Sequence, residues 1–422
     1  MVQPVSGGWN RGVVLAIIRG ELRRLSATID AVSSTPEWHP GRFLQRCPSR
    51  RLGDVVCPGL RSALHLLAGV SIARAPWTVS MEEFKPLVAL TLGDPAGIGP
   101  EIIVGAWTES IVHEWCRPLV VGHPEILRRS VRLWRTGVRV EQIDSPGQAD
   151  PSPDVIPCLA CGSDDVLAVR PGAVDARAGQ AAYEAVVTAA GLALDGHVQA
   201  ITTAPLNKAA LREAGHHYPG HTELLAARCG SSDFAMMLYL GPGPLIRSPH
   251  GLAVVHVSLH APLRRVFELL TPEQIVAKAH LADRFMRRLT GVQPRIGVAA
   301  LNPHAGERGL FGTEEEQIIA PAVARCREEG LQADGPFPVD TLMAQACNGR
   351  FDAVVALYHD QGHITLKLVG MYQAVNVTLG LPIVRTSVAH GTAFDIAWKR
   401  RAECGGMVEA IRVASRLAKL PT

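Results

Sequence analysis

The chain has 422 residues, of which 47% are hydrophobic, and its formal net charge at pH 7 is +3. This apolar content is enough to bury a large core, which excludes a disordered or fibrous protein, and the near-neutral charge gives no indication of nucleic-acid binding. The length exceeds that of one ordinary domain and predicts two lobes.

Residues 1–80 differ in composition from the rest of the chain. Arg, Pro, Ser and Cys are scattered through them without a helical or strand period, whereas Met81 precedes an apolar, strand-like run at 86–92. We expect that Met81 is the biological start and that residues 1–80 are an extension, disordered or the product of a miscalled start; a targeting arm is the alternative. The apolar stretches 13–18 and 60–79 are respectively too short and too interrupted by charge for a membrane span or signal peptide, so we expect a cytoplasmic protein.

After Met81, strand-like and helix-like segments alternate. The apolar strand-like runs lie at 86–92, 119–122, 200–203, 252–257, 295–301 and 353–357, and the helix-like stretches include 176–194 and 272–289. This alternation predicts an α/β fold with a parallel or mixed sheet covered on both faces, whose ligands bind in loops beyond the strand ends. The Gly/Pro-rich segment 241–251 predicts a surface hairpin or loop insertion.

Three histidines follow apolar runs: His260, His304 and His359. A neutral imidazole held at the end of a buried strand can bind a metal ion, and three of them leave positions open for substrate oxygens. Each histidine alone is also compatible with an ordinary loop or core residue. The neighbouring Asn302, Asp360 and Gln361 are polar groups of the kind that support metal ligands, and they favour the functional interpretation.

A second set of side chains consists of hydrogen-bond donors suited to anions: His221, Thr222, Lys367, Asn376 and Arg385. Lys and Arg beside hydroxyl and amide donors suit a phosphate and a carboxylate, and Arg can bind either in a bidentate way. Taken singly, each is more often a surface cation or a helix cap.

The sequence contains no nucleotide-binding fingerprint. The Gly-rich segment 94–101 lacks both the GxGxxG spacing and the Lys-Ser/Thr of a P-loop, so we expect a strand-to-helix turn in which Gly97 and Gly99 let the backbone turn sharply. The nine cysteines have no regular spacing, and the pair Cys158 and Cys161 has no second CxxC partner. They are expected to be ordinary reduced thiols.

Seven longer strings follow one another in a fixed order between residues 88 and 397: TLGDPAGIGPE, TTAPLNK, GHTELLA, LNPHAGERGLFGTEE, GPFPVDTL, YHDQGHITLK and VNVTLGLPIVRTSVAHGTAFDIA. Through them the chain after Met81 closely resembles the PdxA family, the 4-hydroxythreonine-4-phosphate dehydrogenases of pyridoxine biosynthesis. The first 80 residues have no counterpart in that family.

The resemblance implies an isocitrate/isopropylmalate-dehydrogenase-like fold with two α/β lobes around an interdomain cleft. Residues 81–214 with 371–422 would form the first lobe, on the cofactor side, and residues 215–370 the second, with the metal, the substrate and the dimer interface. The implied assembly is a homodimer whose active site uses both subunits. No nucleic-acid or membrane partner is implied.

The resemblance also implies roles for individual residues. His260, His304 and His359 would bind one divalent ion per subunit (zinc, magnesium, manganese or cobalt), with His359 reaching across the dimer interface. Substrate would be contacted by His221, Thr222, Lys367, Asn376 and Arg385. Lys367 and Asp340, which falls where the family places a carboxylate near the reacting end, are the catalytic candidates. The stretch 390–397 is similar to the adenosine-binding segment of the wider fold, so the candidates for NAD or NADP binding are His390, Gly391, Thr392 and Asp395.

The implied reaction is oxidation of the secondary alcohol of a phosphorylated 3-hydroxy acid, followed by decarboxylation of the 3-keto product. The chain departs from the family at Ala389, commonly Asp, and at Trp398, commonly Gly. His363 and the AFDIA ending are more similar to a second branch that oxidises 4-phospho-D-threonate or D-erythronate. A dihydrodiol-dicarboxylate dehydrogenase is a further alternative. A non-catalytic binding protein is disfavoured, because neither the three histidines nor the Lys/Arg pair is missing.

Overall fold

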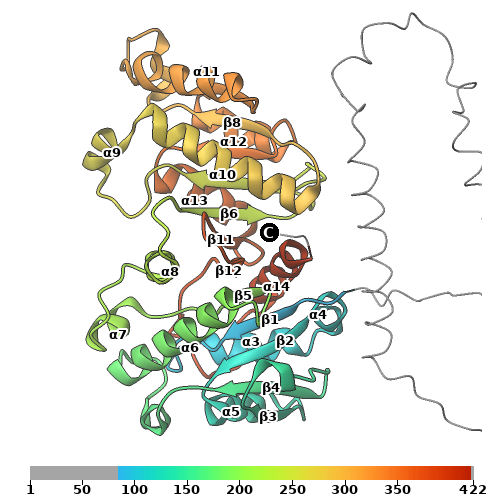
Figure 1. The fold of residues 1–422 in the computed structure, drawn as a ribbon. Coiled ribbons are helices and arrows are strands. Elements are labelled where there is room, and N and C mark those ends of the chain that lie inside the picture. The colour runs from blue at the N-terminus through green and yellow to red at the C-terminus, as the bar shows by residue number, and fades with distance from the viewer. Residues whose placement is uncertain (1–83, 420–422) are drawn as a thin grey trace, which may run out of the picture. The chain divides into compact units, whose positions relative to one another are not determined.

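The computed structural model describes residues 84–419, which belong to one compact unit spanning Met81–Thr422. The expectations for residues 1–80 lie outside the described residues. Figure 1 shows the path of the chain from the blue β1 to the red α14.

Twelve strands within the described residues form a single mixed sheet in the order β3-β4-β2-β1-β5-β12-β11-β6-β7-β10-β8-β9. Their bounds are β1 (Leu87–Thr91), β2 (Arg117–Gly122), β3 (Arg139–Ile143), β4 (Val155–Ala160), β5 (Ala200–Thr203), β6 (Ala235–Leu240), β7 (Leu252–His256), β8 (Arg295–Ala299), β9 (Gln332–Phe337), β10 (Ala353–Ala356), β11 (Val375–Leu379) and β12 (Arg385–Val388). Neighbouring strands are parallel except at three central pairings, where β11 is antiparallel to both β12 and β6, and β6 is antiparallel to β7.

Helices connect these strands and cover the sheet (Figure 1). Their bounds are α3 (Gly99–Trp107), α4 (Ser110–Trp115), α5 (Pro124–Trp134), α6 (Ala176–Leu194), α7 (Lys208–Glu213), α8 (His221–Cys229), α9 (Leu263–Leu269), α10 (Pro272–Thr290), α11 (Ala320–Glu328), α12 (Val339–Cys347), α13 (His359–Gly370) and α14 (Gly405–Ala418). No helix within residues 84–419 is long and apolar enough to cross a membrane.

Strand β1 shows why the sheet is covered on both faces. All five of its residues are buried, and alternate side chains enter different cores because the side-chain period of a strand is two. Val88 and Leu90 pack in a core that includes residues of α3 and α14, whereas Ala89 packs with residues of α6 and α8. A continuous apolar run is therefore the expected sequence of such a strand.

Helix α10 illustrates how local sequence sets an element's ends. Thr271 caps its N-terminus by accepting a hydrogen bond from the backbone N–H of Gln274 at 3.3 Å, and Pro272 occupies the first turn, where no N–H is needed. Gly291 ends the helix in the left-handed conformation, with φ of 76°. The helix packs on the central strands β7 and β10.

The structure confirms the predicted α/β class. Every strand-like run named from the sequence contains a strand, and helices α6 and α10 cover the two predicted helical stretches. The segment 241–251 connects the antiparallel strands β6 and β7, with a bridge between Gly243 and Ile246, so it is a hairpin connection. The cysteines within residues 84–419 are free, and burial raises the pKa of both Cys158 and Cys161 to about 12.

The strand-to-helix turn predicted at 94–101 is present between β1 and α3, and Gly99 is needed there because a Cβ would come within 2.5 Å of the carbonyl oxygen of Leu92. The positive φ of this turn lies at Gly93, at 72°, and neither Gly97 nor Gly99 is in the left-handed region. Gly97 is needed for close approach instead, because a Cβ there would come within 2.8 Å of the Cβ of Thr392. The turn after β1 is therefore packed directly against the segment that follows β12.

Candidate active site

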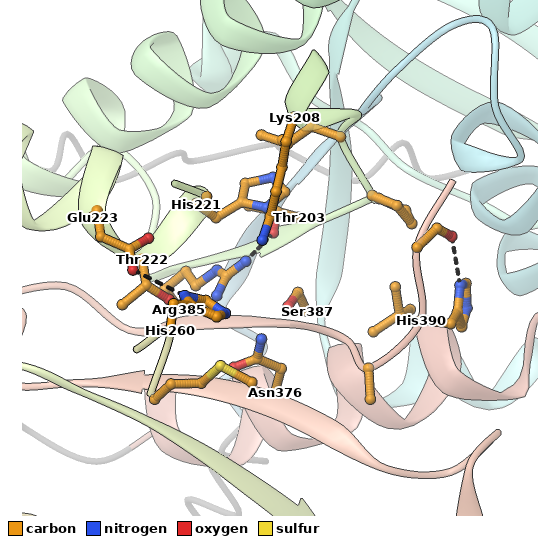
Figure 2. Close-up of a pocket in the computed structure, with 17 residues that line it drawn as sticks. Thr203, Lys208, His221, Thr222, Glu223, His260, Asn376, Arg385, Ser387 and His390 are labelled. Atoms are coloured by element: carbon orange, nitrogen blue, oxygen red, sulfur yellow. Dashed lines mark hydrogen bonds and ion pairs between the residues drawn. The ribbon is translucent and has the colours of Figure 1, made fainter. Parts of the chain in front are cut away.

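A cavity of about 190 Å³ lies beside the central strands β5, β12 and β11, at the N-terminus of α8 (Figure 2). It is lined by Thr203, Pro205, Leu206, Lys208, Gly220, His221, Thr222, Glu223, Met236, His260, Asn376, Arg385, Ser387, Val388, Ala389, His390 and Gly391. The lining is rich in hydrogen-bonding groups and contains two cationic side chains, which suits a small anionic ligand.

Strand register brings polar side chains to this cavity from segments far apart in sequence. Arg385 and Ser387 are two residues apart on β12 and so point to the same face. Ser387 lies opposite Thr203 of the parallel strand β5 and opposite Asn376 of the antiparallel strand β11. The pairing of one parallel and one antiparallel neighbour therefore gathers these groups on a single face of the sheet.

Arg385 is the most buried cation of the cavity, with 1% of its surface exposed. Its two terminal nitrogens donate to Oγ1 of Thr378 at 2.9 Å and to Oγ1 of Thr203 at 2.7 Å, while Nε has no partner. Burial lowers the pKa of Arg385 to about 9, with Glu223 acting in the opposite sense, and this value leaves the guanidinium charged at neutral pH. No carboxylate within residues 84–419 forms an ion pair with it, and Glu223, which lines the same cavity, acts on it only through space.

Other polar atoms around the cavity are also buried without a hydrogen-bond partner: Nε2 of His221, Oε2 of Glu223 and Oδ1 of Asn376. Buried polar groups in folded proteins are nearly always paired, because an unpaired one loses its water without compensation. Four such atoms, counting Nε of Arg385, converge on one cavity. A polar ligand would satisfy them.

The N-terminus of α8 and Lys208 add to the positive character of the cavity. His221, Thr222 and Glu223 form the first turn of α8, and Gly220 precedes it without a capping side chain. The first backbone N–H groups of a helix are suited to binding anions. Lys208 extends into the same space from the start of α7 (Figure 2). Burial, together with the charges of Arg385 and Lys208, lowers the pKa of His221 well below its ordinary value, so this imidazole is neutral.

In both His260 and His359, the Nδ1 atom of the ring lies beside a carboxylate oxygen. Nδ1 of His260 lies 3.3 Å from Oε1 of Glu223, and Nδ1 of His359 lies 2.6 Å from Oδ1 of Asp360. Their ring centroids are 6.3 Å apart. A carboxylate on Nδ1 is the usual support of a metal-binding histidine, because it fixes the tautomer that presents Nε2 to the ion. The donor chemistry of this pair therefore fits a divalent metal.

The third histidine does not join them in the single chain. His304 is exposed, and its backbone is in the left-handed region with φ of 52°. Among the described residues no group of three His, Cys, Asp or Glu side chains is arranged to hold a metal ion. One chain thus brings together two of the three predicted ligands.

The polar neighbours of the histidines have different tasks. Asp360 holds His359, as described. The side chain of Gln361 links two backbone segments: it accepts a hydrogen bond from the backbone N–H of Leu357 and donates one to the carbonyl of Ala300 at 2.9 Å. Its role is therefore structural. The amide nitrogen of Asn302 donates to the carboxylates of Glu314 at 2.6 Å and Glu315 at 2.9 Å. Asn302 therefore stabilises the conformation of its own loop.

Lys367 and Asp340 lie outside the cavity lining. Lys367 lies on α13, and its charge makes a small contribution to the lowered pKa of both His363 and His390, which is caused mainly by burial. Asp340 is exposed in the first turn of α12, where its Oδ1 accepts from the backbone N–H of Thr341 at 2.8 Å. The structure gives Asp340 no contact with the cavity.

The predicted cofactor segment borders the cavity through His390 and Gly391. Thr392 is buried under the turn after β1, with its carbonyl accepting from the backbone N–H of Ile98 at 3.0 Å, and Asp395 is exposed further along. Space around Gly391 is open, since a Cβ there would meet no atom within 4 Å. Gly391 therefore leaves open space at the border of the cavity.

The backbone that continues this segment is held by hydrogen bonds to a buried carboxylate, that of Glu101. Glu101 is fully buried and accepts from the backbone N–H groups of Trp398 and Arg400, and the indole of Trp398 donates to the carbonyl of Pro95 at 2.8 Å. Trp398 has φ of 61°, a conformation that favours glycine.

Sequence reasoning missed several residues of the cavity. Thr203 and Lys208 lie within the string TTAPLNK, and Glu223 lies within GHTELLA. These strings served to identify the family, but none of the three side chains was predicted as a site residue. Ser387 had no signal beyond its place two residues after Arg385 on a strand. Short hydroxyl side chains are common in strands, so only the register identifies them as part of a site.

A doubly covered α/β sheet with a buried anion-binding cavity and adjacent carboxylate-supported histidines defines an enzyme-like site for a small anionic substrate. Comparison with known proteins narrows this class. The family model described as pyridoxal phosphate biosynthetic protein PdxA matches residues 114–414. The chain is 46% identical over 333 residues to D-threonate 4-phosphate dehydrogenase of Pectobacterium atrosepticum, covering 79% of this chain and 99% of the relative.

Two further comparisons agree. The 4-hydroxythreonine-4-phosphate dehydrogenase of Geobacter metallireducens is 43% identical over 340 residues, covering 81% of this chain and 98% of the relative. The crystal structure of 4-hydroxythreonine-4-phosphate dehydrogenase from Klebsiella pneumoniae superposes with a TM-score of 0.70 at 46% identity, over 79% of this chain and all of the other. The chain therefore belongs to the PdxA family, as its sequence motifs had predicted.

Proposed function

We propose that the protein is a metal-dependent, NAD(P)-linked dehydrogenase of the cytoplasm. It oxidises the secondary alcohol of a phosphorylated 3-hydroxy acid of the 4-hydroxythreonine-4-phosphate type, and the 3-keto product then loses CO2. The observation that carries this proposal is the buried charge of Arg385, which forms no ion pair within residues 84–419 and lines a cavity where three other polar atoms also lack partners.

Anion capture is assigned to Arg385, Lys208 and the first turn of α8. A guanidinium held by Thr203 and Thr378 cannot rotate freely, so its remaining N–H donors are fixed in direction before substrate arrives. The neutral His221 and the amide of Asn376 can then bind substrate oxygens by hydrogen bonds without adding charge. Thr222 completes the polar lining.

The residues present fit the two groups that this chemistry requires. His260 and His359, with His304 as a third donor in the assembled enzyme, would hold a divalent ion, which supplies a Lewis acid that lowers the pKa of the substrate hydroxyl. His390, Gly391, Thr392 and Asp395 would bind NAD or NADP, which supplies the hydride acceptor.

We propose that Lys367 acts on the substrate, holding either a proton or the phosphate. Lys367 is a residue of α13, and its charge contributes to the lowered pKa of both His363 and His390 after the larger effect of burial. We assign Lys367 as the general acid or base of the reaction, and Asp340 as a carboxylate that a second subunit contributes.

A homodimer is part of this proposal. His304 and Asp340 are exposed in the single chain and do not line the cavity. Large apolar side chains are also exposed on and beside α13: Ile364, Leu368, Met371 and Tyr372. An apolar surface next to incomplete active-site groups suits an interface with a second copy, which would complete the site.

The proposed lobes also fit the cavity. Thr203, Lys208 and Arg385 come from the first proposed lobe, residues 81–214 with 371–422. His221 and His260 come from the second, residues 215–370. A cavity lined by both is the usual position of an active site in a two-lobed enzyme, and we propose this division for the chain.

Initial rates on the purified protein test the proposal. Formation of reduced nicotinamide is measured with NAD and with NADP on 4-phosphohydroxy-L-threonine, 4-phospho-D-threonate and 4-phospho-D-erythronate. Turnover of the first compound supports the main proposal. Turnover restricted to the second or third would assign the chain to the activity named for the Pectobacterium atrosepticum relative or its D-erythronate counterpart. No turnover with any of the three would contradict the proposed reaction.

A further inference from the structure

Two histidines outside the cavity lining form a buried pair behind His359. His256 ends β7 and is 2% exposed, and His363 lies one turn into α13 and is 4% exposed. Nδ1 of His363 lies 3.1 Å from Nε2 of His256, which is a hydrogen bond between two imidazoles. Nothing in the proposed chemistry so far uses this pair.

The hydrogen bonds of the pair fix the tautomer of both rings. Nδ1 of His256 lies 3.3 Å from the carbonyl oxygen of Met236, which can only accept, so the proton of His256 is on Nδ1 and its Nε2 is an acceptor. His363 must then donate from Nδ1 to His256. The same N–H also faces the carbonyl oxygen of His359 at 3.2 Å, a second acceptor, which is consistent with this assignment.

His363 is also stacked on the ring of His359. Their ring centroids are 3.7 Å apart and the ring planes differ by 11°. His359 is therefore held on its face by His363 and on its Nδ1 edge by Asp360, at 2.6 Å. With face and edge both fixed, the rotamer of His359 is determined and its Nε2 is left for another partner.

Helix α13, which carries His359, has a glycine at the point where it packs against His256. Gly362 of α13 lies directly over His256, and a Cβ at Gly362 would come within 2.6 Å of Nε2 of His256. Any other residue at 362 would push the helix away from β7 or displace the imidazole. Two buried imidazoles also lose more hydration than an apolar pair of similar volume, so packing alone does not explain them.

We propose that His256 and His363 are positioning residues that hold the ring of His359 in the orientation required for metal binding. This inference rests on the proposed function only in taking His359 as a metal ligand. Outer partners of a metal-binding histidine commonly change metal affinity by about ten- to a hundredfold when they are replaced. Loss of the pair is expected to weaken metal binding by that factor.

Titration of the metal-free full-length protein with Co²⁺, followed by visible absorption, measures both affinity and ligand geometry. His363→Phe keeps a planar ring against His359 but removes the N–H, and His363→Gln keeps an N–H donor for His256 but removes the stacked ring. His363→Leu removes both. The matched control is His280→Leu, because His280 is paired with Glu329 on the surface of α10, outside the cavity lining. Thermal unfolding of each variant confirms that it is folded.

The expected result is a Co²⁺ spectrum for wild type and for His280→Leu, and an affinity about ten- to a hundredfold lower, with altered bands, for His363→Leu. The Phe and Gln variants should fall between them. A folded His363→Leu variant with wild-type affinity and spectrum would overturn the positioning role while leaving the metal site intact. Absence of Co²⁺ binding by wild type would overturn the metal site itself and the positioning role with it.

Discussion

The guanidinium of Arg385 donates to Oγ1 of Thr203 at 2.7 Å, a contact between neighbouring parallel strands whose residues are 182 positions apart in sequence. Because a second nitrogen donates to Thr378, Arg385 is fixed on two sides, while Nε–H and one further N–H on each terminal nitrogen are left for a ligand. The first prediction follows from this geometry.

Replacing Arg385 by Lys should lower kcat/KM by about one to two powers of ten, because a charge-assisted contact to phosphate contributes roughly 1.5–3 kcal/mol. Lysine keeps the positive charge but cannot donate to Thr203, Thr378 and a substrate oxygen with one planar group. Steady-state kinetics with the phosphorylated substrate measures the effect.

A substrate analogue without its phosphate provides the control for this variant. If Arg385 binds phosphate, wild type and Arg385→Ala should differ little on the analogue. An equally large defect on both compounds would place Arg385 at the carboxylate or in the structural core.

A second prediction concerns Asp94, a fully buried acid in the turn after β1. Its Oδ1 accepts from the backbone N–H of Ala96 at 2.8 Å, but Oδ2 has no partner, and burial raises its pKa from 3.8 to about 6. A carboxyl group whose pKa is raised by folding binds its proton more tightly in the native state. Its contribution to stability is therefore greatest below about pH 4 and is lost as the pH rises through 6.

Asp94→Asn removes this dependence while keeping an oxygen that can accept from Ala96. At pH 7.5 the variant should be more stable than wild type by up to about 3 kcal/mol, the free energy that corresponds to the pKa shift. The gain should shrink toward zero at pH 4. Denaturant unfolding of both proteins at several pH values gives the difference directly, and a difference that does not change with pH would rule out Asp94 as its source.

The order of the strands could not be predicted in the way that their positions could. Apolar runs such as 200–203 and 353–357 identify buried strands because both faces of the sheet are covered. The antiparallel insertion of β6 and β11 depends on pairings between distant segments, for which the sequence contains no local signal. The mixed character of the sheet was left open for this reason.

The residues of the candidate site also differ in whether the sequence alone could identify them. The charged donor Arg385 and the amide of Asn376 were identified by residue type and motif, and the structure brings them together. Thr203 and Ser387 were missed, because a hydroxyl side chain in a strand has no distinguishing pattern. His304 and Asp340 were named from motifs, but they lie away from the cavity in a single chain.

The third prediction concerns Glu101, which fastens the proposed cofactor segment. Glu101→Gln keeps the volume but turns one carboxylate oxygen into an N–H₂ group, which would face the backbone N–H of Trp398 or Arg400. Leaving one buried donor unpaired should lower the free energy of unfolding by about 1–3 kcal/mol. It should also weaken binding of NADH, followed by Trp fluorescence, because the segment after β12 would be less well fixed.

Glu114→Gln is the matched control, since Glu114 is exposed on α4 and should tolerate the change. Equal stabilities for the two variants would show that the buried carboxylate does not fasten this segment. Loss of stability with unchanged NADH binding would confine Glu101 to a structural role.

The central claim is that turnover of a phosphorylated hydroxy acid depends on a divalent ion held by His260, His304 and His359. The most direct measurement is the initial rate of reduced nicotinamide formation on the accepted substrate before chelation, after removal of metal with EDTA, and after metal is added back. We expect the rate to fall to background in EDTA and to return with Zn²⁺, Co²⁺, Mn²⁺ or Mg²⁺. An unchanged rate in EDTA, together with elemental analysis that finds no bound metal, would contradict the claim.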